Sequence, residues 1–367
     1  MKWHLFNPEH DLALANGTRG FTPPAAGRGI RHGLGFLPAF WASTGDRVLV
    51  EDKKLAQERA REFEAWLPAV TFVSMAECPA ISKQDAEQVD VWGWDAAVRW
   101  QLEKLGFPQE ILPAESDVAA VRRLSHRETS VEILQSLVAE QDFLVGQRVC
   151  VHTIDEVRQC LRDWENIVVK APWSSSGRGV RFFSHGMSDG EEHYVSHVLK
   201  RQGAVIVEPC YDRVMDLAVE WTADGQGMLT YEGLSLFATD GGAYTGNLLL
   251  NEERKWLMLS ELIDTDWLSD TIKRLEPMLV ALTKGQYAGP LGVDMMVVST
   301  GHGLSLHPCV EINLRRTMGH VALAIARRTD YRFHEMCVVP KDNYRLQLLE
   351  TPKTKDNQLQ NIIKKNK

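Results

Sequence analysis

Two neighbouring stretches decide how this chain of 367 residues is interpreted: residues 292–298 (GVDMMVV) and residues 307–320 (HPCVEINLRRTMGH). They flank Gly301 and His302, and they predict two β-strands joined by a tight turn. The first strand carries one acidic residue, Asp294, among apolar residues. The second runs from apolar residues into a polar sequence. We therefore expect the apolar part of the hairpin to pack in the core and its polar end to carry functional side chains.

Polar side chains recur on one face of this predicted hairpin. Alternation along a strand places Glu311, Asn313 and Arg315 together. A turn centred between the strands sets Asp294 roughly opposite Cys309 and on the same face. Two carboxylates and an amide oxygen are hard ligands suited to Mg²⁺. Burying them without a cation is costly, so a metal ion or an arginine is expected nearby. A solvent-facing polar strand is the alternative.

A second candidate site is residues 168–180 (VVKAPWSSSGRGV). The pattern is a strand ending at Lys170, a loop of small residues, and another strand. Small residues let backbone N–H groups approach an anion closely, and the lysine supplies a charge for phosphates. The sequence is neither a Walker A loop nor a Rossmann fingerprint, because GxxxxGK[ST] is absent and a strand follows the loop. A plain β-hairpin with a solvated lysine is the alternative.

A third candidate site follows residues 205–207, a short β-branched run. This predicted buried strand ends at Glu208 and Pro209, as an edge or hinge would. Free backbone groups there can bind the edge of an adenine base. Asp216, eight residues after Glu208, can accept hydrogen bonds from ribose hydroxyls. An ordinary strand end is the alternative reading.

The order of these three sites resembles the ATP-grasp superfamily over residues 117–329. The resemblance implies a nucleotide held between two antiparallel sheets. The phosphate contacts that it implies are Lys170, Ser174, Ser175, Ser176, Gly177 and Gly179. It implies an adenine hinge at Glu208, Pro209, Cys210 and Tyr211, with ribose binding by Asp216. It also implies metal ligation by Asp294, Glu311 and Asn313, and a basic group at Arg315 near the transferred phosphoryl group or the substrate carboxylate.

The family also has a lysine ahead of this domain, and Arg127 falls at that position. A guanidinium can hold a phosphate, with a geometry different from that of an ammonium group. The resemblance implies an ADP-forming ligase that uses ATP and Mg²⁺ or Mn²⁺, with Lys170 and Arg315 as catalytic residues. It would activate a small-molecule carboxylate as an acyl phosphate for attack by an amine or another nucleophile. A small-molecule kinase and a non-catalytic nucleotide-binding protein are the alternatives.

The pattern along the chain predicts a fold that combines α/β and α+β parts. Strands alternate with helices in the first hundred residues, which predicts a parallel layer, whereas later strands read as antiparallel. We expect an N-terminal α/β domain over residues 1–112 and an ATP-grasp domain over 113–340, with a lid subdomain at about 140–205. Residues 341–367 read as a C-terminal extension that is partly disordered.

Composition excludes several classes of protein. The formal net charge of −8 argues against non-specific nucleic-acid binding. No run approaches the ~18 apolar residues of a membrane span. Six cysteines without a CxxC pair, and an N-terminus without a signal-peptide core, favour a cytoplasmic protein with reduced thiols. The expected partners are a small-molecule carboxylate and an amine, with a homodimer as the commonest assembly.

Two further stretches are dense in polar or glycine residues. Residues 7–11 (NPEHD) follow a short predicted strand. A metal site is disfavoured there because consecutive side chains diverge, and a helix N-terminus capped by Asn7 or Asp11 is favoured. Residues 17–35 read as a long loop rich in Gly, Pro and Arg. Both a substrate role and a solvated loop stay open for it.

Overall fold

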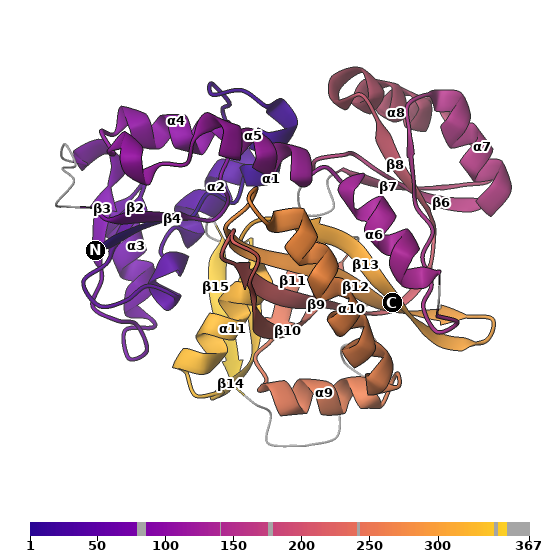
Figure 1. Cartoon of the computed structure of the whole chain (residues 1–367). Coiled ribbons are helices and arrows are strands. Elements are labelled where there is room, and N and C mark those ends of the chain that lie inside the picture. The colour runs from indigo at the N-terminus through magenta and orange to yellow at the C-terminus, as the bar shows by residue number, and fades with distance from the viewer. Residues whose placement is uncertain (79–85, 140, 175–178, 241–242, 341–343, 351–367) are drawn as a thin grey trace. The chain divides into compact units, whose positions relative to one another are not determined.

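The computed structural model describes residues 1–78, 86–139, 141–174, 179–240, 243–340 and 344–350. The described chain forms two compact units (Figure 1). Unit 1 comprises residues 1–123 and 245–251 and the described part of 314–353, and unit 2 comprises residues 124–244 and 252–313. The domain boundaries expected after residues 112 and 340 stay a prediction.

Unit 1 contains a four-stranded parallel sheet in the order β3-β2-β1-β4. Its strands are β1 (Lys2–Leu5), β2 (Arg47–Val50), β3 (Thr71–Ser74) and β4 (Gln88–Val91). The strands are short and rich in apolar residues, as in parallel sheets covered on both faces. Trp3, Leu5 and Leu49 lie in the core of this layer. The parallel α/β layer predicted for the first hundred residues is therefore confirmed.

The order of these strands reverses beside β1. After β1 the chain forms β2 and β3 on one side of that strand, and it then returns to form β4 on the other side. Open α/β sheets bind ligands at the carboxyl ends of the two strands where the order reverses. In unit 1 those strands are β1 and β4, and the helices that follow them are α1 (His10–Asn16) and α4 (Ala96–Lys104).

Further helices and three antiparallel strands complete unit 1. The helices are α2 (Ala25–Leu34), α3 (Lys53–Arg61), α5 (Glu115–Leu124) and α11 (Met318–Arg328), with short 3-10 helices η1 (Leu37–Phe40), η2 (Met75–Glu77) and η3 (Gln109–Ile111). Strand β14 (Phe333–Val339) pairs with β11 (Ala243–Leu248) and with β15 (Arg345–Glu350). Arg328 donates to the carbonyls of Phe40 and Ala42, which ties α11 to the end of η1.

The loop predicted for residues 17–35 is wrong in its second half, which forms α2. Pro24 occupies the N-cap position, next to the helix start where proline is well tolerated. Three glycines inside the helix lower its intrinsic propensity. The helix forms because Arg31 and Leu34 are buried on one side of it, and tertiary packing outweighs propensity.

Helix α1 begins without a side-chain cap. Glu9 is its N-cap residue, and the Glu9 side chain accepts no hydrogen bond from the first turn. Asn7 instead donates to the carbonyl of Gly93 at 2.8 Å and to Asp95 at 3.2 Å. The prediction that Asn7 or Asp11 caps this helix is therefore wrong, because Asn7 is used in a contact between the ends of β1 and β4.

Unit 2 contains two antiparallel sheets, of which the smaller has the order β5-β8-β6-β7. Its strands are β5 (Val149–Val151), β6 (Asn166–Lys170), β7 (Val180–Ser184) and β8 (Val205–Pro209), and its helices are α7 (Ile154–Trp164) and α8 (Asp189–Gln202). Both helices start at a capping box, formed by Thr153 with Glu156 and by Ser188 with Glu191. Their apolar sides and the sheet form one core, which includes Val157, Val169 and Val207.

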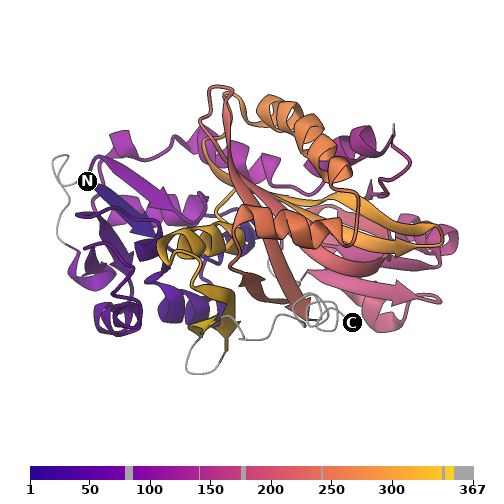
Figure 2. The same cartoon turned by 90° about the horizontal axis from the view of Figure 1, so that it is seen from below.

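The second sheet of unit 2 has the strand order β13-β12-β9-β10. Its strands are β9 (Asp212–Ala223), β10 (Leu229–Asp240), β12 (Gly289–Thr300) and β13 (Gly303–Asn313), and the helices beside it are α6 (Thr129–Val138), α9 (Glu252–Ser260) and α10 (Thr265–Thr283). Figure 2 shows α9 and α10 lying along these long strands. The antiparallel character predicted for the later part of the chain is confirmed.

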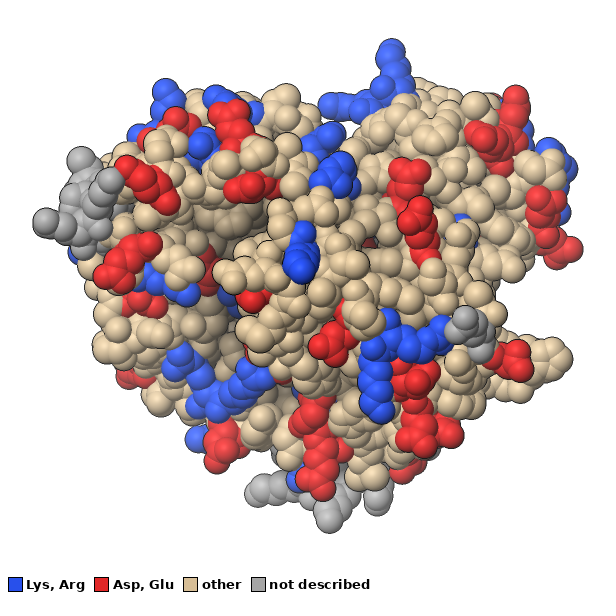
Figure 3. Space-filling model, in the orientation of Figure 1, with Lys and Arg blue, Asp and Glu red and all other residues tan. Residues whose placement is uncertain are grey.

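Charged side chains are mixed on the face of the molecule in Figure 3. Basic and acidic residues are interspersed there with uncharged residues. Among the described residues, no helix is both long and apolar enough to cross a membrane.

Candidate functional site

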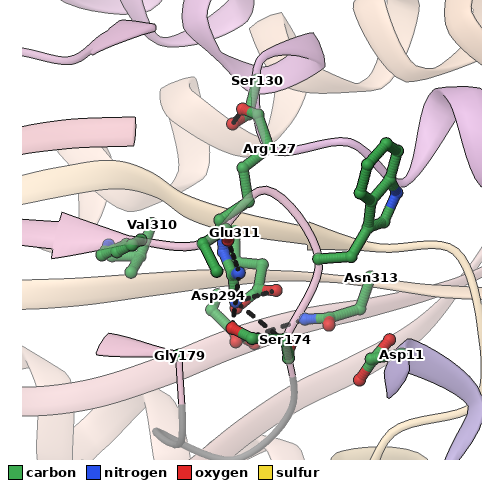
Figure 4. Close-up of polar contacts among 12 residues, drawn as sticks. Asp11, Arg127, Ser130, Ser174, Gly179, Asp294, Val310, Glu311 and Asn313 are labelled. Atoms are coloured by element: carbon green, nitrogen blue, oxygen red, sulfur yellow. Dashed lines mark hydrogen bonds and ion pairs between the residues drawn. The ribbon is translucent and has the colours of Figure 1, made fainter. Parts of the chain in front are cut away.

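The three predicted metal ligands lie together on two paired strands of unit 2. Asp294 on β12 pairs directly with Glu311 on β13, and Asn313 follows on the same face of β13. The Asn313 amide donates to an Asp294 carboxylate oxygen at 3.2 Å. Figure 4 shows these side chains gathered below Arg127. The structure thus brings together the acid–amide set that alternation predicted.

The register of this pair differs from the expectation that Asp294 lies opposite Cys309. The pairing shifts between Asp294 and Met296, where Met296 is opposite His307. Pro308 lies in the shifted stretch and has no N–H to donate to the ladder, so a bulge forms there. The bulge adds residues to β13 and moves Glu311 to the position opposite Asp294.

Arg148 fills the space behind this bulge. Its Nη2 donates to the carbonyls of Cys309 at 3.2 Å and Val310 at 2.6 Å. Its Nε donates to Glu208 at 2.6 Å, and its Nη1 donates to the Ser130 hydroxyl. The side chain is fully buried. No motif marks Arg148 in the sequence, so sequence reasoning missed it.

Glu208 lies between two cations at the end of β8. One of its oxygens accepts from Arg148, and the other accepts from Lys170 Nζ at 2.7 Å. Burial opposes ionisation, but the charges of Arg148 and Lys170 outweigh it and lower the pKa of Glu208 to about 2. Burial also lowers the pKa of Lys170, against the raising effect of Glu208. The Glu208 side chain is therefore committed to this ionic cluster.

Arg127 joins the predicted phosphate loop to the acid–amide set. Its Nη2 lies 2.7 Å from a Glu311 oxygen, and its Nη1 donates to the Ser174 hydroxyl at 2.8 Å and to the carbonyl of Ala171. Figure 4 shows the guanidinium between Glu311 and Ser174. The arginine expected beside a buried carboxylate set is Arg127.

The described ends of the predicted phosphate loop approach each other closely. A Cβ built on Gly179 would lie 2.3 Å from the Cβ of Ser174 and 3.2 Å from that of Ala171. Glycine is therefore required at position 179. The predicted contacts Ser175, Ser176 and Gly177 lie outside the described residues.

The predicted hinge is tied to neighbouring strands. Pro209 pairs with Ile167, and the Cys210 N–H donates to the Asn166 carbonyl at 2.9 Å. The ring of Tyr211 meets that of His307 edge to face, with centroids 5.5 Å apart. The hinge thus runs along the edge of β6 and faces β13.

Asp216 is buried on β9 and already has two partners. Arg213 donates to it at 2.7 Å, and the Thr239 hydroxyl donates to the same oxygen at 2.9 Å. Burial raises the pKa of Asp216, in spite of the opposing charge of Arg213. Asp216 pairs with Met296 of β12, the strand that carries Asp294.

Arg315 does not share the strand face that alternation predicted. Strand β13 ends at Asn313, so the period of two stops before Arg315. Arg315 belongs to unit 1, where its Nε lies 3.1 Å from both Asp11 oxygens and its Nη2 lies 3.0 Å from one of them. The expectation that Arg315 continues the face of Glu311 is therefore wrong, because the chain leaves the sheet at Leu314.

The donor set of unit 2 fits a hard divalent cation. Asp294 and Glu311 offer carboxylate oxygens and Asn313 an amide oxygen, which are the donor types that Mg²⁺ prefers. Within the described ranges no group of three or more His, Cys, Asp or Glu side chains is placed to hold a metal ion. The third donor in this site is the Asn313 amide, and asparagine is not one of those four residue types.

Of the comparisons with known proteins, only that with solved structures finds matches, and it identifies the fold of this chain. The sequence matches no family model and no curated protein. Among solved structures, N5-carboxyaminoimidazole synthetase from Staphylococcus aureus, complexed with ADP, is 11% identical with a TM-score of 0.50, covering 92% of this chain and 82% of that one. Biotin carboxylase from Campylobacter jejuni, in a β,γ-ATP complex, is 12% identical with a TM-score of 0.50, covering 92% of this chain and 75% of that one.

Both neighbours are ATP-grasp enzymes, and both match this chain over nine tenths of its length. This chain has a parallel N-terminal sheet followed by antiparallel sheets, the arrangement predicted from the sequence. At such low sequence identity, the similarity between this chain and the two solved structures is a similarity of backbone fold. This protein therefore has the fold of the ATP-grasp superfamily.

Proposed function

We propose that this protein is an ADP-forming ligase that uses Mg²⁺ and ATP to activate the carboxylate of a small molecule as an acyl phosphate. An amine or another nucleophile would then displace the phosphate. One observation carries the proposal: Arg127 bridges the loop residue Ser174 and Glu311, which pairs across the strands with Asp294. Phosphoryl transfer depends mainly on such positioning and charge neutralisation.

The proposed nucleotide site lies within unit 2. Lys170, Arg127, Ser174 and Gly179, with Ser175, Ser176 and Gly177, would hold the phosphates. The backbone of residues 208–211 would hold the base, and Asp216 the ribose. The ADP and β,γ-ATP complexes of the two structural neighbours support a nucleotide at this fold position.

Asp294, Glu311 and Asn313 would hold Mg²⁺, or Mn²⁺ in its place. The ion, when bound, would neutralise charge on the phosphate oxygens. In the structure, Arg127 pairs with Glu311 at 2.7 Å. A polyphosphate offers Arg127 a competing anion, so nucleotide binding would release Glu311 to act as a ligand.

Arg315 is the proposed contact for the transferred phosphoryl group or the substrate carboxylate. Its guanidinium is oriented in unit 1 by Asp11. A paired arginine keeps its planar donor fork in one direction, which suits bidentate recognition of an oxyanion. The proposed substrates are a small carboxylate and an amine.

The test is nucleotide-dependent stabilisation followed by product analysis. Unfolding is measured with and without Mg²⁺ and ADP, and ligand at 100 times its dissociation constant should add about 2.7 kcal/mol. Pools of carboxylates and amines are then screened for ADP release that requires both. ADP release with a phosphorylated acid and no need for an amine would indicate a kinase instead. Binding without turnover of any pool would indicate a non-catalytic nucleotide-binding protein.

A further inference from the structure

Arg213 and Asp216 are in contact on β9 although they are three residues apart in the sequence. Successive side chains of a strand point to opposite faces, so residues separated by three lie on opposite faces of a regular strand. The pairing of β9 with β12 shifts by one residue between Arg213 and Met215, which leaves Val214 as an extra residue. Such a bulge redirects the side chain beside it, and it brings Arg213 to the face of Asp216.

Thr239 joins this pair from the neighbouring strand. Phe237 on β10 pairs with Asp216, so Thr239, two residues further along β10, lies on the same face of the sheet. Arg213 Nη1 donates to Asp216 Oδ2 at 2.7 Å and also to the Thr239 hydroxyl. That hydroxyl donates to the same Oδ2 at 2.9 Å. One oxygen of the carboxylate is therefore fixed by two donors that also bond each other.

The second oxygen of the Asp216 carboxylate is unpaired and accessible. Oδ1 has no hydrogen-bond partner in the described part of the chain, and it is not among the unpaired oxygens that are fully buried there. The side chain of Asp216 is 11% exposed and that of Arg213 is 28% exposed. Thr239 is half-buried. A ligand can therefore reach Oδ1 without displacing the two donors that hold Oδ2.

Positive charge opposes the effect of burial on Asp216. Burial raises the pKa of Asp216, whereas the charge of Arg213, the Thr239 hydrogen bond and the charge of Lys170 lower it. Arg213 has the largest of these lowering effects, so it favours the ionised carboxylate, which only accepts hydrogen bonds. Lys170 is the proposed phosphate contact, and its charge acts on the same carboxylate.

We propose that Arg213 and Thr239 are positioning residues that make the nucleotide site of unit 2 select ribonucleotides over deoxyribonucleotides. They hold Oδ2 of Asp216, and Oδ1 accepts from the hydroxyls of the sugar. A carboxylate that is already fixed loses little freedom when the ligand binds, so its hydrogen bonds contribute more to affinity. The inference rests on the proposed function, and it adds two residues that act through Asp216.

The experiment compares ADP with 2′,3′-dideoxy-ADP, which has the same base and phosphates but lacks both sugar hydroxyls. Calorimetry with the full-length protein and Mg²⁺ gives the dissociation constant of each nucleotide. We expect the wild-type protein to bind ADP about tenfold or more tightly than the dideoxy nucleotide, as for hydrogen bonds to a charged acceptor. Thr239→Val and Arg213→Met should each weaken the binding of ADP and leave that of the dideoxy nucleotide nearly unchanged.

Three controls separate positioning from a general loss of structure. Thr239→Ser keeps the hydroxyl, so it should keep the preference for ADP that Thr239→Val loses. Arg162→Met removes an exposed arginine of α7 and should leave the preference unchanged. Far-ultraviolet circular dichroism checks the fold of each variant. A variant that only disturbs the fold would weaken the binding of both nucleotides by the same factor.

The outcomes distinguish this inference from the proposed function. If the wild-type protein binds neither nucleotide, the nucleotide site and this inference are both overturned. If it binds both nucleotides equally, the nucleotide site stands and the selection of ribonucleotides is overturned. If Thr239→Val and Arg213→Met keep the wild-type preference for ADP, the positioning role of the two residues is overturned.

Discussion

Glu311 takes part in both proposed roles of unit 2, because it is a proposed metal ligand and is also linked through Arg127 to the phosphate loop. It faces Asp294 across the strands, and it pairs with Arg127, which also holds Ser174. About a quarter of its side chain is exposed (27%), so a ligand can reach it. Its charge is therefore available both to an arginine and to a divalent ion.

Replacing Glu311 by glutamine tests this dual role. The change keeps the size of the side chain and removes its charge. We expect turnover to fall about 100-fold or more, because preorganised charge at the transferred group is lost, while the unfolding temperature changes little. ADP release and circular dichroism measure the two effects. Glu253→Gln on exposed α9 is the matched control, and equal activity of the two variants would contradict the role of Glu311.

The ionic cluster of Glu208 predicts a pH dependence of stability. Its pKa in the folded chain is about 2, below the ordinary 4.5, so its contribution is complete above about 4.5 and disappears as pH falls through about 2. We expect Glu208→Gln to cost about 3–5 kcal/mol near neutral pH, since it leaves Arg148 and Lys170 without their partner.

Urea unfolding at pH 7 and pH 3 measures this difference for Glu208→Gln. The gap between wild type and variant should be smaller at pH 3, where the unfolded wild-type chain has taken up a proton. A gap of the same size at both values would show that the charge of Glu208 does not account for its effect.

At the scale of elements, the bulge in β13 decides which side chains face each other. Pro308 interrupts the ladder, and Arg148 satisfies the carbonyls of Cys309 and Val310 that the bulge exposes. The same guanidinium holds Glu208 on β8. Arg148 is thus a positioning residue that connects the two sheets of unit 2.

Arg148→Lys separates positioning from charge. Lysine keeps the positive charge beside Glu208, but it lacks the planar fork that reaches two carbonyls and a carboxylate together. We expect the affinity for Mg²⁺ to fall about tenfold, as for other residues that orient metal ligands. ADP binding without metal should change less than that. Calorimetry measures both, and equal losses would indicate general destabilisation instead of a shifted register.

The close approach of β6 and β7 at the phosphate loop predicts the effect of Gly179→Ala. The added Cβ would overlap Ser174, with only 2.3 Å between the two Cβ atoms. Overpacking of this kind costs about 1–3 kcal/mol, and it would displace the hydroxyl that Arg127 holds. We expect weaker ADP binding in a titration. Gly190→Ala on α8 is the control, because its Cβ would meet no atom within 4 Å.

At the scale of the whole molecule, the described chain has two units with separate cores. The proposed nucleotide contacts lie in unit 2, on β6, β8, β9, β12 and β13 and the link before α6. The parallel sheet of unit 1 contributes none of them. A ligand of the nucleotide site should therefore stabilise the two units unequally.

Hydrogen exchange with and without Mg²⁺ and ADP tests this expectation. Protection should rise in β6, β8 and β12, by up to about 2.7 kcal/mol at 100 times the dissociation constant, and change little in β1 and β2. Lys170→Ala should abolish the effect. Protection that rises in β1 and β2 as much as in unit 2 would contradict the binding of ADP by the named residues of unit 2.

Several features of the fold and the candidate site are readable in the sequence because they depend on neighbours along the chain. Alternation around Gly301 and His302 predicts the hairpin of β12 and β13, and it places Glu311 and Asn313 on one face. The strand ending at Lys170 before small residues is local as well. The order of these features is sufficient to predict the fold, which the structure confirms, whereas the roles of the site residues stay predictions.

Other features depend on contacts between distant segments, which no local pattern encodes. The partner of Asp294 is set by a bulge that Arg148 supports across more than 150 residues of sequence. The cap predicted at Asn7 is absent because Asn7 bonds the end of β4, 86 residues away. A buried polar group forms a hydrogen bond with a partner that the packed chain places beside it. The free-energy cost of leaving such a group unpaired is larger than the stabilisation that a local helix cap provides. Tertiary structure therefore decides the register of the acid pair and the partner of Asn7.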